Sequence, residues 1–96
     1  MRILIKNPGD EGFRTIVVPN ELGILQQLVD GPIEKVTIAT DCCLVCNEEG
    51  KLRNLPYNCV YCGFVFTGTI LLLGVDGDEF TDCPMSVTMA NGGIEA

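Results

Sequence analysis

The run from Phe64 to Leu73 constrains the fold more than any other stretch of this chain. Successive residues of an extended strand point to opposite faces of a sheet, and in this run both sets are largely apolar. A strand that is apolar on both faces is usually central in its sheet, because each face is covered by another layer. We therefore predict one long central strand over 64–73, with a neighbouring strand on each side.

Shorter patterns before this run predict further strands and one helix. β-Branched or alternating segments separated by turn residues such as Asn7-Pro8-Gly9-Asp10 indicate strands, and leucines at three- and four-residue spacing indicate a helix. Asn20 is placed to cap that helix, and Gly31-Pro32 is placed to end it. The expected strands are Arg2–Lys6, Arg14–Val18, Glu34–Ile38 and Cys42–Cys46, and the expected helix is Leu22–Val29.

The order of these elements, ββαβββ, predicts the fold class. One short helix cannot cover both faces of a sheet of about five strands, so we expect an α+β fold with a curved, mostly antiparallel sheet and one face partly open. Ninety-six residues make one domain, expected over 1–90, and the Gly-rich end at 91–96 is expected to be a flexible tail. So small a sheet leaves an exposed edge strand, which is a template for pairing in a homodimer.

Residues 44–58, LVCNEEGKLRNLPYN, read as a hairpin: a strand ends at Cys46, the chain turns, and a second strand restarts at Lys51. Gly50 closes the turn and is expected to adopt a positive φ. The stretch resembles the core of the Domain of Unknown Function 3846 family, small proteins of phages, plasmids and other mobile elements of gut-type bacteria. The resemblance includes the opening strand, the helix and the later run Thr67–Asp76, and covers about residues 1–80. It implies a fold and a genomic setting, and no activity comes with it.

Charge and composition exclude several classes of partner. The formal net charge is −7, and every basic residue lies in the first 53 positions. Residues 54–96 carry only acids, which excludes broad binding to duplex nucleic acid and suits either a basic protein partner or solubility alone. No apolar stretch is long enough to span a membrane, and the first residues, MRILIKN, lack the pattern of a signal peptide, so we expect a cytoplasmic protein of a bacterial host with no membrane partner.

Two Cys-x-x-Cys pairs, Cys43 with Cys46 and Cys59 with Cys62, flank residues 47–58 at a spacing near that of a zinc ribbon. Four thiolates could hold one zinc ion in a tetrahedron. However, residues three apart on a strand point to opposite faces, so Cys43 and Cys46 could not then share a metal. We expect no cofactor and small, partly buried thiols, with a bound zinc as the alternative.

The residues for catalysis are largely missing. The chain has no histidine, which removes the commonest general base, and the adjacent Glu48 and Glu49 should diverge at a turn rather than act as a pair. We therefore expect no enzyme activity.

The remaining hypothesis is a non-catalytic accessory protein that counteracts a host defence system by binding. It would either occlude a defence protein with its acidic C-terminal half or sequester a small nucleotide messenger. The alternative class is a zinc-ribbon-like structural or interaction module built on the four cysteines. Pro56 and Asn58 could equally shape a turn, and Arg53 could be a solvated loop residue. The candidate ligand-binding residues are Asn47, Lys51, Arg53, Pro56, Tyr57 and Asn58.

Overall fold

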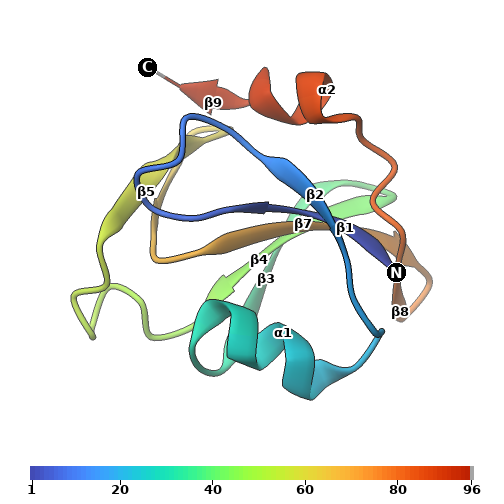
Figure 1. The fold of residues 1–96 in the computed structure, drawn as a ribbon, viewed down its shortest axis with the longest axis horizontal. Coiled ribbons are helices and arrows are strands. Elements are labelled where there is room, and N and C mark those ends of the chain that lie inside the picture. The colour runs from blue at the N-terminus through green and yellow to red at the C-terminus, as the bar shows by residue number, and fades with distance from the viewer. Residues whose placement is uncertain (96) are drawn as a thin grey trace.

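Two antiparallel sheets of unequal size form the protein in the computed structural model, which describes residues 1–95 (Figure 1). The larger sheet has six strands in the order β2-β1-β7-β4-β3, with β8 paired to β7. The smaller sheet has the order β6-β5-β9. The elements are β1 (Arg2–Lys6), β2 (Arg14–Val17), α1 (Leu22–Val29), β3 (Ile33–Ala39), β4 (Cys42–Asn47), β5 (Tyr57–Tyr61), β6 (Phe64–Thr67), β7 (Ile70–Asp76), β8 (Glu79–Thr81), α2 (Val87–Asn91) and β9 (Ile94–Glu95). The expected α+β class, with a mostly antiparallel sheet, is confirmed.

The predicted central strand is present, but it is shorter than expected. β7 lies between β1 and β4, and its residues Ile70 to Leu73 are fully buried. The prediction of one strand over 64–73 is wrong, because β6 and β7 belong to different sheets. Gly68 adopts φ 74°, a left-handed conformation that other residues rarely take, and redirects the chain between the two strands.

The central strands have a covering layer on each face (Figure 1). On one face Leu25 and Val29 of α1 pack on Ile3, Leu71 and their neighbours. On the other face Tyr61 of β5, Phe66 of β6 and Ala90 of α2 pack on the sheet, as members of a second apolar cluster. Because β5, β6, β9 and α2 supply this second layer, the second face is less open than a single helix would leave it.

Helix α1 has the predicted bounds but different caps. Its N-cap residue is Glu21, while the side chain of Asn20 donates a hydrogen bond to the carbonyl oxygen of Phe80 (2.9 Å). The helix ends at Val29, and its C-cap residue, Asp30, takes the left-handed conformation (φ 63°) directly before Gly31-Pro32. Among residues 1–95, no helix is both long and apolar enough to cross a membrane.

Residues 91–95 have regular structure where the sequence predicts a flexible tail. Asn91 ends α2, a helix that was not predicted and that Ser86 caps by accepting a hydrogen bond from the N–H of Met89 (3.1 Å). β9 then pairs with β5, and the carbonyl oxygen of Gly93 accepts from the N–H of Cys62 (3.0 Å). Ala96, also part of the expected tail, lies outside the described residues.

Candidate ligand-binding groove

Residues 48–56 connect the two sheets and do not form the tip of a hairpin. β4 pairs with β3 and β7, whereas β5 pairs with β6 and β9, so the predicted pairing across this segment is wrong. Successive turn hydrogen bonds hold the loop, including Arg53 N–H to the Glu49 oxygen (2.8 Å) and Leu55 N–H to the Gly50 oxygen (2.9 Å). The loop lies beside β3 and β6, and its residues line one groove together with residues of these two strands.

Gly50 is needed in this loop for a reason other than the predicted one. It is absent from the residues with positive φ between positions 1 and 95, so the expected left-handed turn is wrong. The side chain of Asn47 makes the turn instead, since its Oδ1 accepts from the N–H of Glu49 (2.7 Å). A Cβ at Gly50 would lie 2.7 Å from the Oγ1 atom of Thr67. Close contact between the loop and β6 is therefore what favours glycine at this position.

A groove of about 410 Å³ lies between the loop, the outer strand β3 and the outer strand β6. Its volume falls within the usual range for a small-ligand site. The lining residues are Glu34, Lys35 and Val36 of β3, Cys46 and Asn47 of β4, Glu48, Gly50, Lys51 and Leu52 of the loop, and Phe64, Val65, Phe66 and Thr67 of β6.

The groove combines exposed apolar side chains with charges of both signs. Leu52 is 86% exposed, Phe64 57% and Val65 48%, although each is a large apolar residue. The acidic and basic residues of the lining, two of each, have no ion-pair partner in the described part of the chain, where the one salt bridge joins Arg53 to Asp30. Such a mixed surface can bind a ligand that has both apolar and charged groups.

Of the six predicted ligand-binding residues, only Asn47 and Lys51 line the groove. The Asn47 side chain is nonetheless occupied inside the protein, because its Nδ2 donates to the carbonyl oxygens of Val29 (3.0 Å) and Asp30 (2.9 Å). It joins the end of α1 to the start of the loop. Lys51 is exposed and is the one predicted residue whose side chain is free to meet a ligand in this groove.

The other four predicted residues lie elsewhere. Arg53 turns to Asp30, donating from Nη1 to its carbonyl oxygen (2.6 Å) and from Nη2 to its carboxylate (3.2 Å). Asn58 is buried, and its Oδ1 accepts from the ammonium of Lys6 (2.7 Å), which is buried as well. Its Nδ2 donates to the carbonyl oxygens of Lys6 (2.9 Å) and Gly68 (2.8 Å). Pro56 and Tyr57 are exposed outside the groove lining.

Sequence reasoning missed the apolar wall formed by β6. The dipeptide Cys62-Gly63 carries a signal in its glycine, since Gly readily supplies the positive φ that the second position of a type I′ hairpin turn requires. Both residues have positive φ, 48° and 87°, and the turn pairs Tyr61 with Phe64. If the dipeptide is interpreted as a turn, residues 64–67 become the second strand of a hairpin. They are then no longer the first part of the predicted central strand.

The structure does not bring the four cysteines of the proposed zinc site together. Cys43 and Cys46 point to opposite faces of β4, as expected for a strand, and belong to different apolar clusters. Cys59 is buried with the cluster of Cys46, whereas Cys62 is exposed in its turn. Burial raises the pKa of the Cys43 and Cys46 thiols to about 11. Within residues 1–95 no three His, Cys, Asp or Glu side chains gather to hold a metal ion.

Comparison with known families identifies the chain. A family model described as a domain of unknown function, DUF3846, matches residues 1–90. The protein therefore belongs to this family, as the resemblance in residues 44–58 and the flanking segments indicated. No match was found among curated proteins or among solved structures.

Proposed function

We propose that this protein is a non-catalytic binding protein that counteracts a host defence system by holding part of a defence protein in the groove between β3 and β6. The observation that supports it is the gathering of Leu52, Phe64 and Val65, all exposed, on the walls of one groove. Exposed apolar residues that cluster in this way are typical of interaction sites. The mobile-element setting implied by the family resemblance suggests that the partner is a defence protein.

The chemistry of the groove favours a protein over a nucleotide messenger. Phosphate groups are best held by the planar fork of arginine, and Arg53 points away to Asp30. Lys51 lines the groove, but Glu34 and Glu48 line it as well and offset its charge. The side chain of Lys35 lies on the face of β3 opposite to Val36, which packs on the groove side. A peptide segment offers apolar side chains and charges of both signs, which match this lining.

A plaque assay tests the proposal. Bacterial hosts carrying different defence systems would express the wild-type protein, the double variant Leu52→Ser with Phe64→Ser, or Val17→Ser. Val17 is a matched control because it is 77% exposed on β2, at the opposite edge of the larger sheet. We expect wild type and Val17→Ser to restore phage growth on one host, and the double variant to lose at least about tenfold of that effect.

All three proteins should unfold at similar temperatures, since the changed side chains are exposed. Full activity of the double variant, or no restored growth on any host, would contradict the proposal. A nucleotide that copurifies with wild type and is detected by native mass spectrometry would instead favour the messenger hypothesis.

A further inference from the structure

Strand β3 presents a free edge to the groove. Its inner edge pairs with β4, where Glu34 lies opposite Cys46 and Val36 opposite Leu44. Along an antiparallel ladder, pairs of opposite residues that exchange backbone hydrogen bonds alternate with pairs that do not. The N–H of Glu48 donates to the carbonyl oxygen of Pro32 (2.8 Å), so Pro32 and Glu48 form a bonded pair. The pairs formed by Glu34 and Val36 are therefore the bonded ones. The backbone N–H and C=O groups of Ile33, Lys35 and Thr37 point away from β4.

The opposite wall of the groove is also a free strand edge. The two-residue turn at Cys62-Gly63 makes Tyr61 and Phe64 a bonded pair of the hairpin, so the next pair, Val60 and Val65, is non-bonded. The backbone groups of Val65 accordingly point away from β5. Lys35 and Val65 both line the groove, so two strand edges with unpaired backbone groups border one apolar space.

We infer that the groove recognises its partner by strand addition: an extended segment of the bound protein pairs with the β3 edge, and its alternate side chains enter the groove. This inference rests on the proposed function and specifies how the partner is held. Edge strands are templates for pairing, and in this mode of recognition backbone bonds supply affinity while alternate side chains supply specificity.

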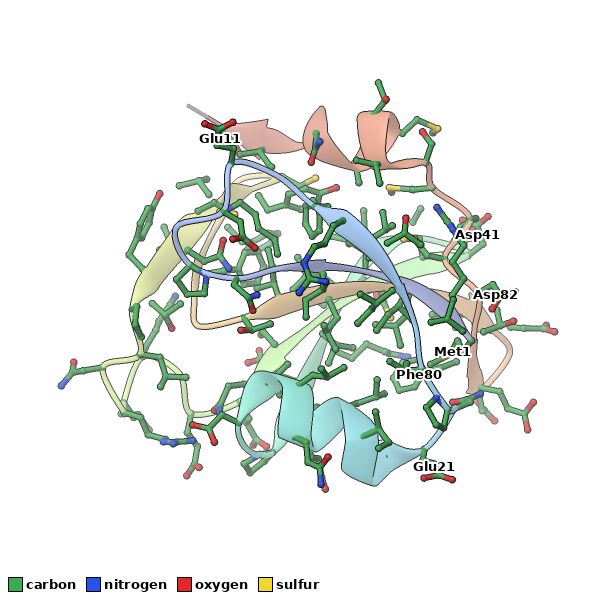
Figure 2. All side chains as sticks on the ribbon, in the orientation of Figure 1. Met1, Glu11, Glu21, Asp41, Phe80 and Asp82 are labelled. Carbon is green, nitrogen blue, oxygen red and sulfur yellow. The ribbon has the colours of Figure 1, made fainter. Side chains whose placement is uncertain are left out.

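Charge complementarity defines the sequence of such a segment. Directly opposite residues of an antiparallel pair share a face, and Val36 packs on the groove side. A partner residue opposite Val36 should therefore be apolar, and one opposite Glu34, two residues away on the same face, should be cationic. A residue opposite Lys35 should be anionic and lie on the other face. Asp41 does not belong to this edge: it lies in the β3–β4 turn, at the end of the sheet away from the loop, where Asp82 also lies (Figure 2), and its carbonyl oxygen accepts from the N–H of Val75 in β7 (2.9 Å). The formal net charge of the chain, −7, further favours a segment with net positive charge.

A second copy of this chain fits the edge less well than such a segment. A two-fold axis through Lys35 would place Lys35 opposite its own copy, and an axis through Glu34 would do the same for Glu34. Like charges directly opposite each other destabilise a strand pair. An axis through Val36 would avoid this repulsion, but it would place Lys35 opposite Thr37 and Glu34 opposite Ile38, so neither charge would gain a partner. The inference therefore commits to a segment of another protein that alternates apolar and charged residues and carries net positive charge.

The test uses a matched pair of substitutions at one position. Lys35→Pro removes the outward N–H and leaves the β4 ladder intact, and proline is tolerated in edge strands at such positions. Lys35→Ala removes the same charge and keeps the N–H. A phage-displayed library of random peptides of about ten residues, panned against the full wild-type chain, supplies the probe. We expect the recovered peptides to alternate apolar residues and to bind Lys35→Pro at least about tenfold more weakly than Lys35→Ala, because both variants lack the charge and only Lys35→Pro lacks the N–H.

Amide hydrogen exchange measured by NMR provides a second readout in the unmodified protein. In the free chain the amides of Lys35 and Thr37 should exchange fast, and those of Glu34 and Val36 slowly. A bound peptide should slow the exchange of Lys35 and Thr37. This measurement keeps the test decisive even if Lys35→Pro fails to fold.

The outcomes separate the mode of binding from the function itself. Peptides that are lost on Leu52→Ser with Phe64→Ser but retained on Lys35→Pro would leave the groove a protein-binding site and overturn strand addition alone. A library that yields no peptide sensitive to any of these groove variants would contradict both proposals. A dimeric protein whose Lys35 and Thr37 amides already exchange slowly would assign the edge to a second copy and likewise overturn the inference.

Discussion

Asn47 and Asn58 adjoin the 48–56 loop and use their side-chain polar atoms inside the protein, whereas Lys35 and Lys51 line the groove without an ion-pair partner in residues 1–95. The first pair is buried and the second is exposed. A buried polar group must be satisfied internally, because leaving it unbonded costs free energy, while an exposed group remains bonded to water. Lys6 is buried and bonded to Asn58, although it is a lysine like Lys35 and Lys51. Burial, and not residue type, therefore separates the scaffold of this site from its binding surface.

The largest effect should come from the buried pair of Asn58 and Lys6. Asn58→Ala removes the acceptor of the Lys6 ammonium, which is 3% exposed, and leaves a buried charge without a partner. We expect the free energy of unfolding to fall by about 3 kcal/mol or more, measured by urea denaturation. Gln27→Ala, at an exposed position of α1, is the control and should have little effect. If both variants were equally stable, Asn58 would not belong to the scaffold.

Adding Lys6→Met to the Asn58 substitution should sharpen this result. Replacing both partners removes the unpaired charge, so the combined loss should be smaller than the sum of the two single losses. Additive losses would show that the two side chains are not coupled.

Asn47→Ala should have the next largest effect. The substitution removes two bonds donated to the end of α1 and one accepted from the loop, and we expect a loss of about 2 kcal/mol in the free energy of unfolding. Asn20→Ala removes one exposed bond, to Phe80, and should cost less than about 1 kcal/mol. Chemical denaturation of both variants gives the comparison, and the reverse ranking would argue against a structural role for Asn47.

Cys46 lines the groove and is also buried, so it belongs to both regions. The dependence of the unfolding free energy on pH tests whether its thiol is shielded from solvent. Burial raises the pKa of Cys46 and Cys43 from 9.0 to about 11, so the folded state retains protons that the unfolded state loses. The free energy of unfolding is therefore unaffected by titration of the two thiols below pH 9. It declines as the pH rises toward 11, by at most roughly 1.4 kcal/mol per pH unit for each thiol.

Replacing Cys43 and Cys46 by Ala should flatten this decline in the unfolding free energy between pH 9 and 10. Cys62→Ala, at an exposed position, should leave the slope unchanged. An unaltered slope in the double variant would mean that these thiols are accessible to solvent.

The smallest effect is expected for Arg53→Ala. The Arg53–Asp30 pair is exposed, with 40% and 80% of the side chains accessible, so its loss should cost less than about 1 kcal/mol. Because Arg53 lies outside the groove lining, plaque-assay activity should remain at the wild-type level. The nucleotide hypothesis makes the opposite prediction, since Arg53 would be the main phosphate ligand, and loss of activity in a folded Arg53→Ala protein would revive it.

Several elements could be predicted because local pattern alone decides them. The bounds of α1 follow from leucines at helical spacing, and the hairpin of β1 and β2 follows from two strand-like segments around a turn. The central position of β7 follows from residues that are apolar on both faces. Opposite orientations of Cys43 and Cys46 follow from the two-residue period of a strand.

The candidate site could be predicted only in part. The sequence draws attention to residues 44–58, and Lys51 lines the groove, but the β3 and β6 walls come from segments that precede and follow this stretch. No local pattern in residues 44–58 indicates which distant strands pack beside them. The sequence offers Asn58 as a polar group for a ligand, and nothing local indicates that the side chain bonds instead to Lys6, which lies far away in the chain.

The amino-acid sequence by itself determined the helix, the strand periodicity and the lack of a histidine base, because each depends on neighbouring residues or on composition. The tertiary structure alone decided that β6 and β7 belong to different sheets, that Asn58 accepts a hydrogen bond from a buried lysine, and that the edges of β3 and β6 border one groove. These features depend on contacts between residues far apart in the chain. Their energies arise from burial and hydrogen bonding in the folded state, which local periodicity does not encode.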